Sequence, residues 1–213
     1  MLHELTTIHG ENLAGTPWQV YPRPQLKRNS YVNLNGIWDF AVYDQPEFPK
    51  EDLQINVPFC PESLLSGLKM QVKPGSFLFY RRSFTAETPN GRLLLHVGAA
   101  DQIADIYVNQ KHVCHHEGGY EAFSCDLTEA KGEILDITIR CRDDLKDQSF
   151  PYGKQVLPEK RGGMWYTPVS GIWQTVWIES VPEEYITDMA NLYKNNCFEY
   201  MKLQKDAGRF SED

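Results

Sequence analysis

Short segments in which apolar and polar residues alternate recur along most of this chain, and they constrain its fold more than any other feature. Segment 134–141 sets Leu135, Ile137, Ile139 and Cys141 on one face. Similar segments stand at 37–43, 53–57, 76–84, 92–97, 105–113, 121–127 and 171–180. A period of two is typical of half-buried strands, and no helical pattern long enough for a crossover stands between them. The pattern predicts an all-β, antiparallel sandwich.

The charge of the chain argues against a nucleic-acid partner. Its 213 residues carry 29 acidic and 21 basic side chains, a formal net charge of -8, whereas proteins that bind nucleic acid rely on Lys and Arg to neutralise phosphates. No stretch approaches the roughly 18 apolar residues of a membrane span. The N-terminus lacks the basic segment and apolar run of a secretory signal. We therefore predict a cytoplasmic chain without a membrane partner, or a periplasmic or secreted one if a leader was removed.

The sequence indicates neither a cofactor nor a metal. It contains no GxGxxG, no P-loop and no HExxH. Strand alternation would turn His112, Cys114 and His116 to one face, and His and Cys are zinc ligands. Cys114 stands where a core residue is expected, however, so ordinary strand positions are favoured over a metal site. The five cysteines form no CxxC pair and are interpreted as reduced thiols.

Two long irregular segments, 10–29 and 142–170, interrupt the strand pattern. Loops of this length are uncommon in compact domains and are often functional. The second holds "RDDLKD" at 142–147, and clustered carboxylates bind calcium or the hydroxyls of sugars. A solvated loop is the alternative. No pair of acids is singled out as the flanking carboxylates of a glycosidase.

Five motifs stand in an order and spacing that resemble a known domain. They are "LNGIWDF" (34–40), "VPFCPESLLSG" (57–67), "YRRSF" (80–84), "HVGAADQIADIYVNQKHVCHHEGGYEAFSCDLTE" (96–129) and "WYTPVSGIWQTVWIE" (165–179). Together they resemble the N-terminal sugar-binding domain of glycoside hydrolase family 2, the family of β-galactosidases, β-glucuronidases and β-mannosidases. The resemblance covers about residues 10 to 186. It implies a jelly-roll sandwich of the galactose-binding-domain-like type, here 1–186.

The same resemblance implies that catalysis resides elsewhere. In the family an immunoglobulin-like domain and a (β/α)₈ barrel follow this domain, and the barrel supplies both catalytic glutamates. We therefore assign no catalytic residue and expect the chain alone to be inactive. The expected function is a non-catalytic, sugar-binding domain of a retaining β-glycosidase that helps to position substrate and to hold the enzyme together. Two alternatives stay open: a stand-alone carbohydrate-binding module, and a structural domain that pairs with a partner chain or as a homo-oligomer.

The resemblance also suggests sugar contacts. A family aspartate that reaches the active site matches Asp143, with Asp144 as the neighbouring alternative. The "GKQ"-like segment of the family matches Gly153, Lys154 and Gln155, and is implied to lie near the barrel mouth. Trp165 belongs to the same long loop and is a further candidate. Without the barrel these residues form half a site, so binding of a β-glycoside is expected to be weak.

The last strand and the C-terminal tail carry two further expectations. Segment 171–180 has two largely apolar faces, so we expect one to build the core and the other to be shaped for a neighbouring domain. The first face holds Trp173, Thr175 and Trp177; the second holds Ile172, Gln174, Val176 and Ile178. For residues 187–213 the spacing of apolar side chains predicts an atypical tail that is either a short helix or partly disordered.

Overall fold

A computed structural model describes most of the chain. The described residues are 7–13, 15–50, 53–85, 91–130, 134–144, 149–151, 153–155 and 163–188, with four short strands beyond them. The helical turns are α1 (Ile8–Glu11), η1 (Pro24–Leu26), η2 (Leu64–Ser66) and η3 (Thr128–Ala130). Among the described residues, no helix is long and apolar enough to cross a membrane.

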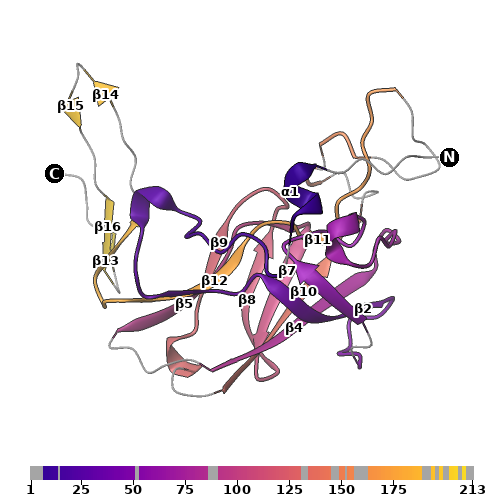
Figure 1. The fold of residues 1–213 in the computed structure, drawn as a ribbon. Coiled ribbons are helices and arrows are strands. Elements are labelled where there is room, and N and C mark those ends of the chain that lie inside the picture. The colour runs from indigo at the N-terminus through magenta and orange to yellow at the C-terminus, as the bar shows by residue number, and fades with distance from the viewer. Residues whose placement is uncertain are drawn as a thin grey trace.

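The strands form two facing sheets (Figure 1). One has four strands in the order β1 (Tyr31–Asn33), β12 (Val176–Val181), β5 (Arg92–Val97), β9 (Phe123–Asp126). The other has six, in the order β3 (Leu53–Val57), β2 (Gly36–Tyr43), β4 (Phe77–Thr85), β10 (Ile134–Arg142), β7 (Ile103–Val108), β8 (Lys111–Glu117). Every pairing within them is antiparallel. This arrangement confirms the predicted all-β sandwich of the jelly-roll kind.

The core lies between the two sheets and is filled by the alternating residues of each strand. The predicted apolar face of β10 is fully buried, at Leu135, Ile137, Ile139 and Cys141. Large side chains from the six-stranded sheet, including Trp38, are buried with them. Burial of apolar area at this scale is the main force that holds two sheets together.

The hairpin between β7 and β8 departs from simple strand alternation in its register. Asn109 and Gln110 both have positive φ, as a tight two-residue hairpin turn requires. The register shifts between Ile106 and Tyr107, and a bulge of this kind turns side chains to the opposite face. His112 and His115 therefore both reach Asp105, with ring nitrogens 3.1 and 2.8 Å from its Oδ1. The predicted grouping of His112, Cys114 and His116 on one face is wrong.

The segment predicted as one strand at 171–180 is broken into β11 (Gly171–Ile172) and β12. Ile172, Val176 and Ile178 belong to the core. The opposite face is covered at the buried Trp177 by the chain's own N-terminal segment, where the Arg23 guanidinium lies over the Trp177 ring, 5.4 Å from its centroid. At Trp177 the prediction of a face shaped for another domain is therefore wrong.

Glu179 fixes that covering segment to β12. Its carboxylate accepts hydrogen bonds from Tyr21 Oη at 2.7 Å, Arg23 Nη2 at 2.7 Å and Arg28 Nη1 at 2.9 Å. His96 Nε2 lies 2.8 Å from the same carboxylate, and its ring stacks on Trp177 with centroids 4.8 Å apart. A fully buried carboxylate is stable only when paired in this way.

The C-terminal tail was predicted to be helical or partly disordered, but its described residues are not helical. They form short strands, β13 (Tyr185–Asp188) with β16 (Lys202–Lys205) and β17 (Gly208–Arg209), and β14 (Tyr193–Lys194) with β15 (Cys197–Phe198). No helix is present among them, and β13 crosses the boundary expected at residue 186. Asn195 and Asn196 are poor helix formers, whereas aromatic residues such as Tyr193 and Phe198 favour strands. A few apolar residues near helical spacing were too weak a signal.

Candidate functional site

Three chain segments meet at one end of the sandwich, where the short strand β6 (Ala100–Asp101) pairs with β11. Asp101 ends β6, Asp143 follows the last residue of β10, and Ser170 stands directly before β11. All three side chains are buried polar groups. The pairing of strands from distant parts of the sequence therefore gathers acids at this end of the fold.

Asp143 and Glu62 are joined through Ser170. Ser170 Oγ lies 2.9 Å from Asp143 Oδ2 and 2.8 Å from Glu62 Oε1, and the Ser170 amide donates to Glu62 Oε2 at 3.2 Å. Burial raises the pKa of Asp143 to about 7, the nearby acids Asp101, Glu62 and Asp144 add to the rise, and the contact with Ser170 opposes it. Burial also raises the pKa of Glu62.

Asp101 and Gln155 form a second buried pair beside the first. Gln155 Nε2 donates to Asp101 Oδ2 at 3.0 Å, and Gln155 Oε1 accepts from the Val169 amide at 2.5 Å. Burial raises the pKa of Asp101, while Gln155 opposes the rise. Gly119 lies against this carboxylate and leaves no room for a Cβ. The Asp101–Gln155 pair thus binds Val169 through Gln155, and Glu62 and Asp143 bind the next residue of the same loop, Ser170.

Above Asp101 and Gln155 lies an open depression of about 240 Å³. Its lining residues are Asp101, Tyr120, Lys154, Gln155, Tyr166, Thr167, Val169 and Trp173. The Tyr120 and Trp173 rings meet edge to face with centroids 6.0 Å apart, and Trp173 Nε1 donates to the Gly119 carbonyl at 2.8 Å. Gly153 has positive φ, and a Cβ there would come 2.9 Å from Tyr120 Oη. Aromatic walls around a few polar groups are typical of small-ligand sites.

The structure brings some of the sequence-predicted residues together here. Lys154 and Gln155 line the depression. Asp143 lies in the acid group that holds Ser170, and Asp144 Oδ2 is 3.9 Å from Arg142 Nη2. Trp165 is half exposed in the adjoining loop and does not line the depression. Whether any of these residues contacts a sugar stays a prediction.

Sequence reasoning missed the aromatic walls of the depression. Tyr120 was not named among the sugar-contact candidates and Trp173 was interpreted as part of an apolar face, yet both line the depression and Tyr120 is 50% exposed. Tyr166 was not singled out, although it follows Trp165 directly. Tyr120 and Tyr166 come together at the end of the fold where β6 pairs with β11. A pairing between strands so far apart cannot be read from a single sequence, so the sequence offered no signal for these walls.

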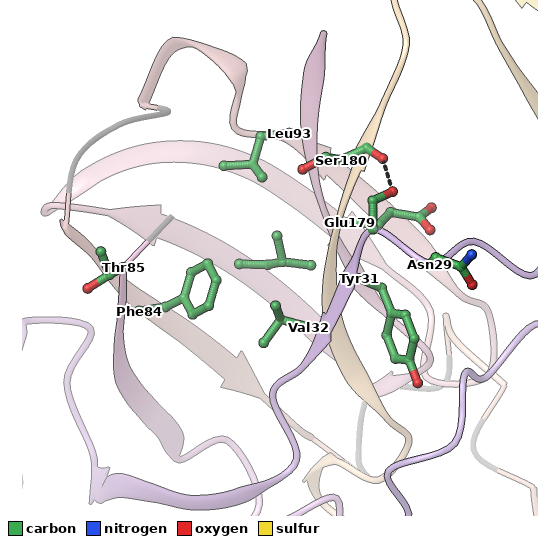
Figure 2. Close-up of a pocket in the computed structure, with 10 residues that line it drawn as sticks. Asn29, Tyr31, Val32, Phe84, Thr85, Leu93, Glu179 and Ser180 are labelled. Atoms are coloured by element: carbon green, nitrogen blue, oxygen red, sulfur yellow. Dashed lines mark hydrogen bonds between the residues drawn. The ribbon is translucent and has the colours of Figure 1, made fainter. Parts of the chain in front are cut away.

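A second depression of about 310 Å³ opens at the side of the sandwich between β1 and β4. Figure 2 shows Phe84 and Val32 directed into it from opposite sheets, beside Leu93. Its polar groups lie largely on one side, where Ser30 Oγ donates to the Ser180 carbonyl at 2.6 Å. Of these two depressions, only the first is lined by sequence-predicted sugar-contact residues, Lys154 and Gln155, so we take that one as the candidate site.

Comparisons with known proteins come from sequence and from structure. No family model matches the chain. It is 28% identical over 115 residues to a β-glucuronidase of Bacteroides fragilis, covering 53% of this chain and 16% of that protein. It is 31% identical over 186 residues to a putative β-glucuronidase of Formosa agariphila, and this match covers 81% of this chain and 21% of that protein. The chain thus spans about a fifth of the length of these curated relatives.

Solved structures share the fold. A Ruminococcus gnavus β-glucuronidase superposes with a TM-score of 0.61 at 20% identity, over 83% of this chain and 32% of that one. A Faecalibacterium prausnitzii β-glucuronidase superposes with a TM-score of 0.56 at 21% identity, over 79% of this chain and 34% of that one. These likenesses show that the sandwich described above is also a part of much longer proteins.

Proposed function

We propose that this chain, a homologue of β-glucuronidases that resembles the N-terminal domain of glycoside hydrolase family 2, is a non-catalytic sugar-binding domain. Its depression at the β6–β11 end would contact a β-glycoside, and the surrounding loop would pack against a catalytic domain. The single observation that carries the proposal is the aromatic depression over a buried acid and amide, at the end where the family resemblance implies the barrel mouth.

The chemistry of the depression supports a sugar. Aromatic faces pack against the C–H faces of a pyranose ring, and Tyr120, Tyr166 and Trp173 supply such faces. The Lys154 ammonium and the Gln155 amide offer the donors and acceptors that hydroxyls require. A β-glucuronide is the preferred ligand to test, because the relatives are named β-glucuronidases and one Ruminococcus gnavus structure holds D-glucuronic acid.

The loop itself supports the packing part of the proposal. Met164, Trp165 and Tyr166 are consecutive and respectively 66%, 48% and 65% exposed. Three large exposed side chains in a row form an apolar surface of the kind that marks interaction sites. In the proposed arrangement, Trp165 contacts either the sugar or the catalytic domain from the rim of the depression. Asp143 supports the loop by its contact with Ser170, and Asp144 is its neighbour in the chain.

Calorimetric titration tests the proposal. The full chain is titrated with the methyl β-glycosides of glucuronic acid, galactose and mannose, with sucrose as the control. Saturable binding of at least one β-glycoside, at about millimolar affinity, is the expected result. A flat response to all of them would reject sugar binding and leave the structural interaction domain. In that case sedimentation with and without residues 187–213 would detect self-association.

A further inference from the structure

One hydroxyl group stands between two buried carboxyl groups at the base of the candidate site. Ser170 Oγ is 2.8 Å from Glu62 Oε1 and 2.9 Å from Asp143 Oδ2. A serine hydroxyl has a single hydrogen to donate. If both acids were ionised, one of these two contacts would bring two oxygen lone pairs together without a hydrogen between them. A second hydrogen is therefore needed, and a carboxyl group must carry it.

The remaining contacts identify which acid holds that hydrogen. Glu62 Oε2 accepts the Ser170 amide at 3.2 Å, so both oxygens of Glu62 face donors, as suits an ionised carboxylate. Asp143 Oδ1 is buried and has no hydrogen-bond partner among the described residues. An unpartnered oxygen costs much less in a neutral acid than in a carboxylate. Asp143 is thus the neutral member, and its O–H donates to Ser170 Oγ.

The surroundings favour the same assignment. Asp101, Glu62 and Asp144 are the charged groups that act most strongly on Asp143, and all are acids. Asp144 lies 3.9 Å from Arg142. The other titratable groups close by are the thiols of Cys60 and Cys141 and the Tyr80 phenol, all protonated because burial raises their pKa values. Burial and like charges raise the pKa of Asp143 to about 7.

We propose that Glu62, Ser170 and Asp143 form a clamp that shares one proton at mildly acidic pH, with Asp143 as a neutral, hydrogen-donating acid. Asp143 is then a positioning residue. It fixes Ser170, and the preceding residues Thr167 and Val169 line the depression. Deprotonation would set two like charges against one hydroxyl and weaken the attachment of this loop. The proposal holds whether or not the depression binds a sugar.

Carboxyl ¹³C NMR on the unmodified full chain tests the clamp directly. We expect one carboxyl of the pair to titrate near pH 7 and the other to be ionised at pH 6. Titration of both carboxyls below pH 5 would overturn the proposal. The two apparent values belong to the pair, because coupled groups do not titrate separately.

Two amide variants give an independent answer. Asn at 143 can donate to Ser170 as the neutral acid does, so Asp143→Asn should keep the unfolding constant within about threefold at pH 5. Gln at 62 has one acceptor oxygen for two donors, so Glu62→Gln should raise the unfolding constant by about tenfold or more. Asp144→Asn, which alters the neighbouring acid outside the clamp, is the matched control. Equal damage from Asp143→Asn and Glu62→Gln at pH 5 would contradict the assignment.

The pH dependence has a defined sign. The folded pKa of Asp143 is raised, so its contribution to stability is complete below the unfolded pKa, near pH 4, and is lost as the pH rises through about 7. The ratio of wild-type to Asp143→Asn unfolding constants should therefore rise, by at most about tenfold per pH unit, across this window. A ratio that stays constant from pH 4 to 7 would overturn the proposal.

Discussion

Tyr120 is the residue through which the candidate site is most easily probed. Its ring is half exposed and meets Trp173 at the edge of the depression, so its removal leaves the core intact. We expect Tyr120→Ala to weaken β-glycoside binding by about 1 kcal/mol, roughly fivefold, because one aromatic face is lost. Calorimetry measures the change. Trp18→Ala, at an exposed tryptophan outside the depression, is the control, and equal losses in both variants would count against the site.

At this scale the sequence predicted part of the site. Lys154 and Gln155 were named in advance and line the depression. Gln155 also binds Asp101, a contact between residues 54 positions apart. Such distant pairings depend on which strands become neighbours, and one sequence does not contain that information. Tyr166 and Trp173 were missed as site residues for the same reason.

The N-terminal segment and β12 are joined by Glu179, and this contact is the main test at the scale of elements. Glu179 is almost fully buried and contacts Tyr21, Arg23 and Arg28. We expect Glu179→Ala to lower the free energy of unfolding by about 3–5 kcal/mol, because two arginines lose their buried partner. Urea denaturation measures the loss. The exposed Glu183 gives the control Glu183→Ala, and a loss below about 1 kcal/mol at Glu179 would contradict the role.

The same carboxylate predicts how the domain responds to acid. Burial alone would raise the pKa of Glu179, but its contacts with His96, Tyr21 and Arg28 outweigh burial and hold the pKa at about 2. Its stabilising contribution is therefore complete above the unfolded pKa, near 4.5, and is lost as the pH falls towards 2. As the pH is lowered through this window, the melting temperature should fall steeply for the wild type and only slightly for Glu179→Gln. Parallel curves would argue against the paired carboxylate.

The elements themselves were the most predictable level. Alternation located β2, β3, β5, β10 and most other strands of the sandwich, because a half-buried strand needs one apolar face. It failed where local pattern and tertiary contacts diverge. The break between β11 and β12 depends on β6, a pairing partner about 70 residues earlier in the chain. The bulge that redirects His112 lies within the β7–β8 hairpin, and the tail strand β13 pairs with β16, so neither follows simple alternation.

For the chain as a whole, we predict sugar binding without turnover. The relatives are β-glucuronidases, and the chain matches about a fifth of their length. We expect pure protein to hydrolyse 4-nitrophenyl β-D-glucuronide no faster than buffer, because the family resemblance implies that both catalytic glutamates belong to the barrel. Release of nitrophenol is followed by absorbance, with a boiled sample as control. Turnover that persists through repeated purification would show a catalytic site within these 213 residues.

The central claim is that a β-glycoside binds at the β6–β11 end of the sandwich. The most direct measurement is a ¹⁵N NMR titration of the full chain with methyl β-D-glucuronide. We predict saturable chemical-shift changes, with about millimolar affinity, at the Trp173 indole, the Gln155 side-chain amide and the Tyr166 backbone amide. Shifts confined to the side depression around Phe84, or none at concentrations well above millimolar, would contradict it.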